Sequence, residues 1–137
     1  MLGDHTVRLV PFKHRHYGML LHMLEDQEAP FLGFVSYKTL PKIGYLAMLG
    51  KHPVAAGFLR RVEGGYAQLD TFVSNRHFGS LVRHEGLSKV TEALINDAKD
   101  LKLLGILAIT IDDGIIQRAK DQGFHVINQV LVGKLLD

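Results

Sequence analysis

The sequence predicts an α/β (α+β) fold in which a mixed, mostly antiparallel central sheet is flanked by helices. Three strand-like runs, at residues 44–49, 54–62 and 66–73, follow one another with short glycine-containing breaks, which indicates a meander of antiparallel hairpins. The apolar period then changes, because from Leu87 onward apolar residues recur every three or four positions, as on one face of a long helix. A further apolar run after this helix is typical of a sheet with mixed strand directions.

The remaining elements follow from the same apolar periods. Pro11 ends a short alternating strand, and Gly123 suits the left-handed position that closes a short helix. The apolar run at 103–110 is expected to be a strand buried on both faces. In chain order, the expected elements outside the meander are a strand at 6–11, a helix at 16–24, a short helix near Ser36, the helix from Leu87, the strand at 103–110, a short helix at 114–122 and a final strand at 124–135. No linker or repeat interrupts them, so we expect one domain over residues 1–137.

Composition excludes several classes of protein. Hydrophobic residues make up 47% and charged residues 22% of the chain, an ordinary globular balance that argues against disorder. The chain has no cysteine, which excludes disulfides, thiolate catalysis and cysteine-ligated zinc and fits a reducing compartment. The net charge of +2 lacks the clustered excess of a nucleic-acid-binding protein, and the longest apolar run, 103–109, is too short to span a membrane. We therefore expect a cytoplasmic protein that binds neither nucleic acid nor membrane.

Two short segments, within the predicted order of elements, carry a resemblance to a known family. Arg83-His84-Glu85-Gly86-Leu87-Ser88 stands where the meander gives way to the long helix, and the later short helix ends in Gly123-Phe124. In this arrangement the chain resembles a small, divergent member of the GNAT superfamily of N-acetyltransferases. The resemblance implies an acyl-CoA-dependent N-acyltransferase that moves an acetyl group from acetyl-CoA to a primary amine of a small molecule or a protein. The alternative is a catalytically inactive GNAT-like domain that binds CoA or a macromolecular partner.

The resemblance assigns acetyl-CoA binding to two places. The first is a pyrophosphate loop formed by Arg83, His84, Glu85, Gly86, Leu87 and Ser88. A phosphate there would meet the unpaired N–H groups of a first helical turn, and Gly86 has no Cβ to keep the backbone away. The alternative is an ordinary loop glycine ahead of a helix that Ser88 caps. The second place is the end of the third meander strand, where Phe72, Val73 and Ser74 would lie along the pantetheine arm; the link that follows, 74–82, is longer than is usual in the family.

Asp70 and Asp112 are the candidates for a general base that removes a proton from the acceptor amine. The alternatives are an ordinary solvent-facing strand residue for Asp70 and a helix N-cap for Asp112. Alternation along the strand predicts one face with Gln68, Asp70 and Phe72 and another with Ala67, Leu69, Thr71 and Val73. The resemblance also places Ala119 where many relatives carry a tyrosine that protonates the departing thiolate.

The remaining polar residues suggest little further chemistry. The eight histidines are scattered without the spacing of metal ligands, so no metal site is expected. Arg60 and Arg61 are expected to be solvated charges at a strand end. Residues 13–16, Lys-His-Arg-His, form a small basic cluster that could touch an acidic substrate or could be no more than a solvated helix start. An exposed edge at Val130, Leu131 and Val132 could pair two copies of the chain as a homodimer.

Overall fold

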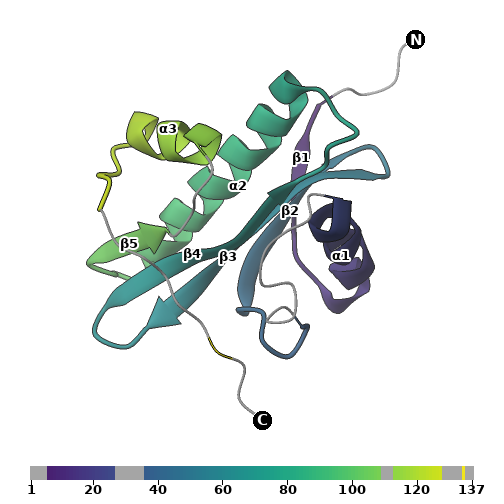
Figure 1. Cartoon of the computed structure of the whole chain (residues 1–137). Coiled ribbons are helices and arrows are strands. Elements are labelled where there is room, and N and C mark those ends of the chain that lie inside the picture. Colours follow the sequence, from purple (N-terminus) through teal and green to yellow (C-terminus); the bar gives the residue numbers. More distant parts are fainter. Residues whose placement is uncertain (1–5, 27–35, 109–112, 128–133, 135–137) are drawn as a thin grey trace. The chain divides into compact units, whose positions relative to one another are not determined.

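The computed structural model, drawn in Figure 1, describes residues 6–26, 36–108, 113–127 and 134. The chain divides into two compact units, Met1–Leu107 and Ala108–Asp137. The elements, in chain order, are β1 (Arg8–Pro11), the 3-10 helix η1 (His14–His16), α1 (Tyr17–Asp26), β2 (Ile43–Leu49), β3 (His52–Val62), β4 (Tyr66–Ser74), α2 (Ser80–Asp100), β5 (Gly105–Ala108) and α3 (Asp113–Asp121). In the described part of the chain, no helix is both long enough and apolar enough to cross a membrane. The single domain expected from the sequence stays a prediction.

The described strands form one sheet in the order β1-β2-β3-β4-β5. The first three pairings are antiparallel, as the meander predicts. β5 runs in the same direction as β4, because their first residues lie together: Leu104 N–H donates to Gly65 C=O at 2.8 Å, and Gly105 lies against the Tyr66 ring. Helix α2 supplies the crossover that parallel neighbours need. The predicted mixed, mostly antiparallel sheet flanked by helices is confirmed.

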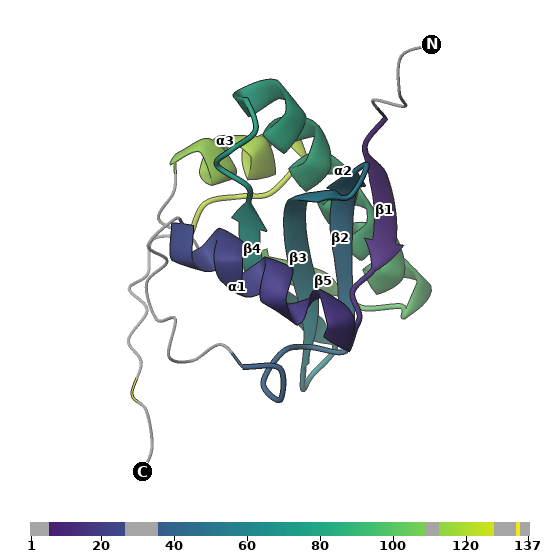
Figure 2. The same ribbon diagram turned by 90° about the vertical axis from the view of Figure 1, so that its right-hand side faces the viewer.

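The sheet lies between two helices, with α1 on one face and α2 on the other (Figure 2). On the α1 face, Leu20 and Met23 pack with Phe58 and Val73 in a cluster that excludes water. On the α2 face, Val90 and Leu94 are completely buried. Because both faces of the sheet are covered, the middle strands are buried along most of their length.

One extra residue in β4 breaks its alternation. Ala56 of β3 pairs with Val73, but Phe58, two residues further on, pairs with Asp70, three residues further back. Directly opposite residues share a face, so Asp70 lies on the α1 face with Phe58, and Val73 lies there with Ala56. The expectation that Asp70 and Val73 lie on opposite faces is wrong, because a bulge shifts the period-two pattern by one residue.

Four other elements differ from their expected form. Near Ser36 the chain makes a turn, closed by Thr39 and Leu40 N–H donating to Ser36 C=O, and not a helix. Helix α2 begins at Ser80, seven residues before Leu87. Leu107 of β5 is 45% exposed, because this strand lies at the edge of the described sheet. Residues 124–127 are irregular, and the rest of the expected final strand lies outside the described residues apart from position 134.

Helix α3, described within its own unit, closes as the sequence predicts. Gly123 has a φ of 89°, and its N–H donates to Lys120 C=O at 3.0 Å. Phe124 N–H donates to Ala119 C=O at 3.0 Å, which completes a Schellman motif. Ala119 and Gly123-Phe124 therefore serve the end of this helix.

Candidate functional site

The β4 bulge holds a strained backbone in place with a side-chain hydrogen bond. Thr71 has a φ of 53°, in the left-handed region that favours glycine, and its branched Cβ makes this conformation cost on the order of 1–3 kcal/mol. Its Oγ1 donates to Asp70 Oδ1 at 2.7 Å. Such strain persists only where neighbouring contacts hold it, and it concentrates at active and ligand-binding sites. The bulge is therefore the first place in this fold to look for a site.

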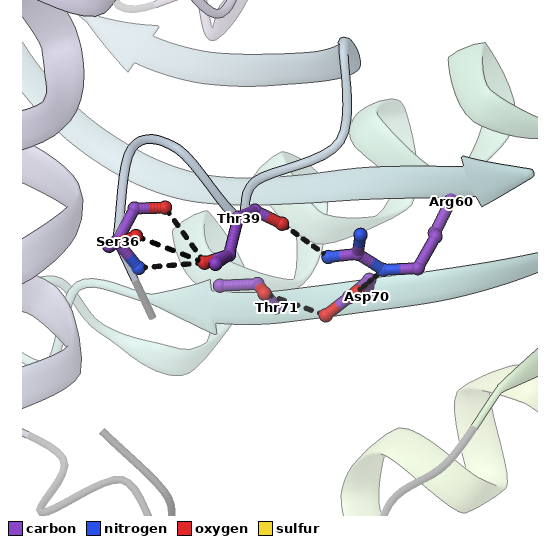
Figure 3. A network of polar contacts seen from close by, with 5 residues as sticks. All are labelled: Ser36, Thr39, Arg60, Asp70 and Thr71. Carbon is purple, nitrogen blue, oxygen red and sulfur yellow. Dashed lines mark hydrogen bonds and ion pairs between the residues drawn. The ribbon is translucent and has the colours of Figure 1, made fainter. Parts of the chain in front are cut away.

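A polar network joins the bulge to the turn at Ser36 (Figure 3). Arg60 of β3 donates from Nε to Asp70 Oδ2 at 2.6 Å and from Nη2 to Thr39 C=O at 2.7 Å. The turn itself is closed by Ser36 N–H donating to Thr39 Oγ1 at 2.9 Å. The expectation of a solvated strand-end charge is wrong for Arg60, because the register makes Asp70 its diagonal cross-strand neighbour.

The three strand residues expected to bind acetyl-CoA lie directly after the bulge. Phe72 turns to the α2 face, where its ring fills the space above Gly57 beside Val90. Val73 and Ser74 are buried. Because β5 has four described residues and begins beside Tyr66, it flanks only the first half of the nine-residue β4. In the described part of the chain, the outer edge of β4 from Thr71 to Val73 has no strand beside it.

The long link between β4 and α2 is held by hydrogen bonds of Asn75 to β3 and by contacts of Arg76 and His77 with Asp26. Asn75 N–H donates to Val54 C=O at 2.7 Å, and its Nδ2 donates to Pro53 C=O at 2.8 Å. The side-chain oxygen of Asn75 accepts from His77 N–H at 2.9 Å, which forms an Asx turn. Arg76 donates to the main-chain carbonyl of Asp26, and His77 Nε2 lies 3.3 Å from the Asp26 carboxylate. The link therefore ties the end of α1 to the start of α2.

The structure moves the start of α2 ahead of the expected pyrophosphate loop. Gly79 is the N-cap, and Arg83 N–H already donates to Gly79 C=O at 3.1 Å. The expectation that residues 83–88 open the helix is wrong, because the helix begins three residues before Arg83 and this segment runs from the end of its first turn into its third. A Cβ on Gly86 would lie 2.7 Å from Val54 Cγ1, so this glycine allows α2 to pack on the sheet. The unpaired N–H groups of the first turn belong to Ser80, Leu81 and Val82.

The other residues of that segment divide between the two sides of α2. Leu87 is buried with Gly86, whereas His84 and Glu85 are exposed. Ser88 Oγ lies 3.5 Å from His84 Nε2 one turn earlier, on the outer side of the helix. Arg83 is half-buried, and its Nε is a buried polar atom to which none of the described residues offers a hydrogen-bond partner.

Comparisons with solved structures decide what this arrangement is. A GNAT-family acetyltransferase from Staphylococcus aureus superposes with a TM-score of 0.70 at 17% identity, covering 90% of this chain and 86% of that chain. A putative acetyltransferase from Agrobacterium tumefaciens gives 0.71 at 13% identity, covering 93% and 99%. Rv2747 from Mycobacterium tuberculosis, in complex with CoA, gives 0.72 at 16% identity, covering 92% and 76%. This chain has the GNAT fold. No protein-family model and no curated protein matches its sequence.

One of these similar structures holds CoA, and the described residues of this chain fit such a group in part. The side of Gly86 on which a Cβ would stand faces Val54 and Ala55, so this glycine packs on the sheet, and its role toward phosphate stays a prediction. Arg83 does fit an anion, because a buried guanidinium nitrogen without a partner costs free energy until an acceptor reaches it. It directly follows the three residues that carry the unpaired N–H groups of the helix start, where negative charge is also favoured.

Of the two candidates for the general base, the structure describes only Asp70. Asp112 lies outside the described residues. Asp70 is described, with both carboxylate oxygens bonded, one to Arg60 and one to Thr71, and with 22% of its side chain exposed. A carboxylate has about four acceptor positions, so two remain for an incoming N–H. Its role as a base stays a prediction.

Many GNAT relatives have a thiolate-protonating tyrosine at the position of Ala119, and Tyr17, Tyr45 and Tyr66 are the candidates to replace it here. Tyr45 Oη donates to Asp97 Oδ2 at 2.7 Å, and this hydrogen bond, with burial and the nearby negative charge, raises the pKa of Tyr45 to about 12. This phenol is a structural link between β2 and α2. Tyr66 lies at the opposite end of β4 from the bulge, and Tyr17 packs edge-on against Tyr37. None of the three contacts the bulge in a described hydrogen bond.

Two residues of the site, Arg60 and Thr71, are not predicted from the sequence. No local pattern marks either, because Arg60 matters through strand register and Thr71 through its backbone angle. Among the described residues, no three histidine, aspartate or glutamate side chains come together as metal ligands.

Proposed function

We propose that the chain is an acyl-CoA-dependent N-acyltransferase that moves an acetyl group from acetyl-CoA to a primary amine. The observation that supports it is the outer edge of β4 from Thr71 to Val73, which has no strand beside it in the described part of the chain and lies directly before the link to α2. In the GNAT fold, a backbone edge at this point offers N–H and C=O groups to an extended amide chain such as pantetheine. Structural similarity to a GNAT-family acetyltransferase and to Rv2747, which has CoA bound, supports this proposal.

Each part of the site has a role in this proposal. The edge at Phe72 and Val73 would align the pantetheine amides, while Arg83 and the N–H groups of Ser80 to Val82 would hold the phosphates. Acetyl-CoA supplies a thioester whose acyl carbon is open to attack. A backbone N–H of β4 would stabilise the negative charge that develops on the carbonyl oxygen. Asp70 or Asp112 would accept the amine proton, and the amine nitrogen would bond to the acyl carbon as the carbon–sulfur bond breaks and CoA leaves as its thiolate, which takes a proton from solvent.

Acetyl-CoA binding is the first test. At about 100 times the dissociation constant, a ligand stabilises the folded state by about 2.7 kcal/mol, which for this length raises Tm by several degrees or more. Arg83→Gln should weaken acetyl-CoA binding about tenfold or more, because a charge-assisted hydrogen bond to phosphate is lost. Arg61→Gln is the matched control, since Arg61 is exposed on β3. No rise in Tm at millimolar acetyl-CoA, with circular dichroism showing folded protein, would refute the binding claim.

A non-catalytic domain that binds CoA is the second candidate, and one observation favours it. Asp70 is already bonded at both oxygens and Ala119 carries no acidic proton, so the described residues offer a weak set of acid–base groups. Release of the CoA thiol across a panel of primary amines separates the two functions. If acetyl-CoA binds and no amine releases thiol above the hydrolysis rate, the non-catalytic reading holds.

Three expectations from the sequence remain proposals. The acceptor is a small-molecule or protein amine, the location is cytoplasmic, and two chains pair through 130–132, which lies outside the described residues. Sedimentation velocity on the intact chain tests the homodimer.

A further inference from the structure

Basic and acidic residues are unevenly spread along the chain. Residues 29–62 contain five Lys or Arg and no Asp or Glu, and residues 5–24 contain three Lys or Arg and again no acid. The modest net charge of +2 therefore hides a basic N-terminal half. What matters for binding is whether the fold gathers these charges or scatters them.

The fold brings two of these segments together. The end of β1 lies beside the start of β2, because Phe12 N–H donates to Gly44 C=O at 2.9 Å. This contact sets Lys13 near Lys42, and both side chains are exposed. The His14 ring lies 4.2 Å from the Tyr37 ring, measured between centroids, which ties η1 to the turn that carries Lys38.

We call the resulting surface the basic–aromatic patch. It comprises Lys13, His14, Arg15, Tyr17, Tyr37, Lys38 and Lys42. Its four lysine and arginine side chains are exposed, and Tyr37 lies between His14 and Tyr17 as a partly exposed aromatic platform. The sequence showed only the 13–16 cluster; the structure adds the aromatic rings and the charges from the second segment.

Burial and the positive charge of the patch lower the pKa of a neighbouring side chain, His16. His16 accepts a hydrogen bond at Nδ1 from Lys13 N–H at 2.9 Å, and the side chain is buried. Its pKa is lowered, first by burial and then by the charges of Arg15 and Lys13. These two cations therefore act on the same small region.

The patch is connected to the bulge by the network of Figure 3. Thr39, next to Lys38, accepts from Arg60 at 2.7 Å, and Arg60 is 2.6 Å from Asp70. Asp70 is the carboxylate that this network brings toward the patch, and Arg60 already pairs with it. These contacts link the turn that carries Lys38 to the bulge, and both oxygens of the Asp70 carboxylate in them are already bonded.

We propose that the basic–aromatic patch binds an acidic peptide segment, and that the acceptor of the transfer is an amine carried by such a segment. The second half of this statement rests on the proposed function; the first half does not. Charge complementarity favours a carboxylate-bearing chain, because the four exposed cations of the patch form no ion pair with any described residue and so attract negative charges. The aromatic rings supply apolar contact to the peptide backbone and its side-chain stems.

The experiment measures peptide binding in the absence of acetyl-CoA. The probe is the peptide Ala-Glu-Asp-Glu-Asp-Glu with a free amino end and a fluorophore at its carboxyl end, read by anisotropy. Its matched control is Ala-Gln-Asn-Gln-Asn-Gln with the same label. We expect the acidic peptide to bind at least tenfold more tightly at about 50 mM salt and to lose most of that advantage at about 500 mM, where exposed charges are screened.

Two double variants locate the binding surface. Lys13→Gln with Lys38→Gln removes one charge from each segment of the patch and should weaken acidic-peptide binding roughly fivefold. Lys99→Gln with Lys120→Gln removes the same charge from α2 and α3 and should change binding less than twofold. All four lysines are exposed, so each variant is expected to fold.

The outcomes separate this inference from the proposed function. Equal affinity for the acidic and amide peptides, or equal loss in the two double variants, overturns the patch while leaving the acetyl-CoA result untouched. Tighter binding of a ten-nucleotide oligo(dT) than of the acidic peptide also overturns it, because the ligand would then be a nucleic acid. If the acidic peptide binds at the patch and is not acetylated faster than the amide peptide, the binding surface stands and the acceptor claim fails.

Discussion

Replacing Gly86 with alanine tests the packing of α2 on the sheet. In an exposed helix interior, this change stabilises by about 1 kcal/mol, because alanine has the better helix propensity. Here the new Cβ would lie 2.7 Å from Val54 Cγ1 and 3.3 Å and 3.4 Å from the Cβ atoms of Ala55 and Ala47. Val54 is completely buried and β-branched, so it has no rotamer into which to retreat. Overpacking costs about 1–3 kcal/mol, and we expect a net loss of about 1–2 kcal/mol.

Thermal and urea unfolding measure this loss, and Gly18→Ala is its control. Gly18 lies in α1 with no described atom within 4 Å of where a Cβ would be, so alanine there should raise stability by about 0.5 kcal/mol. The two variants should therefore shift Tm in opposite directions, Gly86→Ala downward by roughly 4–8 °C. A rise in both would refute the close approach of α2 to β2 and β3.

The same variant separates two roles for Gly86. If its purpose is packing, Gly86→Ala lowers the Tm of the free protein and leaves the acetyl-CoA-induced rise nearly unchanged. If Gly86 instead lined the pyrophosphate, as the sequence suggests, the free protein would keep its Tm and the rise with acetyl-CoA would shrink. Measuring Tm with and without acetyl-CoA on one preparation decides between them.

Three further predictions concern titratable side chains. Asp70→Asn should lower stability by no more than about 1 kcal/mol, because the Arg60 pair is partly exposed, but should lower the rate of thiol release about 100-fold or more if Asp70 is the base. The lowered pKa of His16 means that the unfolded chain binds the proton more readily, so this contribution to stability is complete above about pH 6.5 and is lost as pH falls toward the folded pKa. His16→Gln should flatten the dependence of Tm on pH across this window. Tyr45 has a raised pKa of about 12, so its contribution is complete below about pH 10 and is lost between about pH 10 and 12. Tyr45→Phe should cost about 1 kcal/mol and remove the latest-titrating phenol from the ultraviolet absorbance titration.

Each of these has a contradicting result. An unchanged rate of thiol release in Asp70→Asn removes it as the base. A wild-type slope of Tm against pH that survives in His16→Gln assigns the titration to another group. Simultaneous titration of all tyrosines near pH 10 would mean that Tyr45 does not donate to Asp97.

Much of the fold could be predicted because local patterns encode it. The meander follows from short glycine-containing breaks between apolar runs, and the closure of α3 follows from Gly123, whose φ of 89° suits glycine. The start of α2 was misplaced because residues 80–86 lack the apolar stripe that begins at Leu87, while the anchored link at Asn75 allows the helix to begin earlier. The apolar pattern does not predict the turn at Ser36, because the Thr39 hydroxyl closes it by accepting from Ser36 N–H and donating to Ser36 C=O.

The candidate site was harder to predict because its key features depend on register. Asp70 was named as a candidate base, yet its binding to Arg60 requires knowing which residue of β3 lies diagonally opposite. The left-handed Thr71 leaves no mark in a sequence, since threonine is an ordinary strand residue.

By itself, the sequence determined the three-stranded meander, the long helix that follows it, the residues available for chemistry and the absence of any thiol. Those properties depend on composition and on apolar period, which act over a few residues. Only the tertiary structure decided that β4 carries a bulge, that Gly86 serves packing, and that residues 13–16 meet the turn at Ser36. These depend on distances between segments that are far apart in the chain, and such distances exist only once the sheet has formed and its register is set.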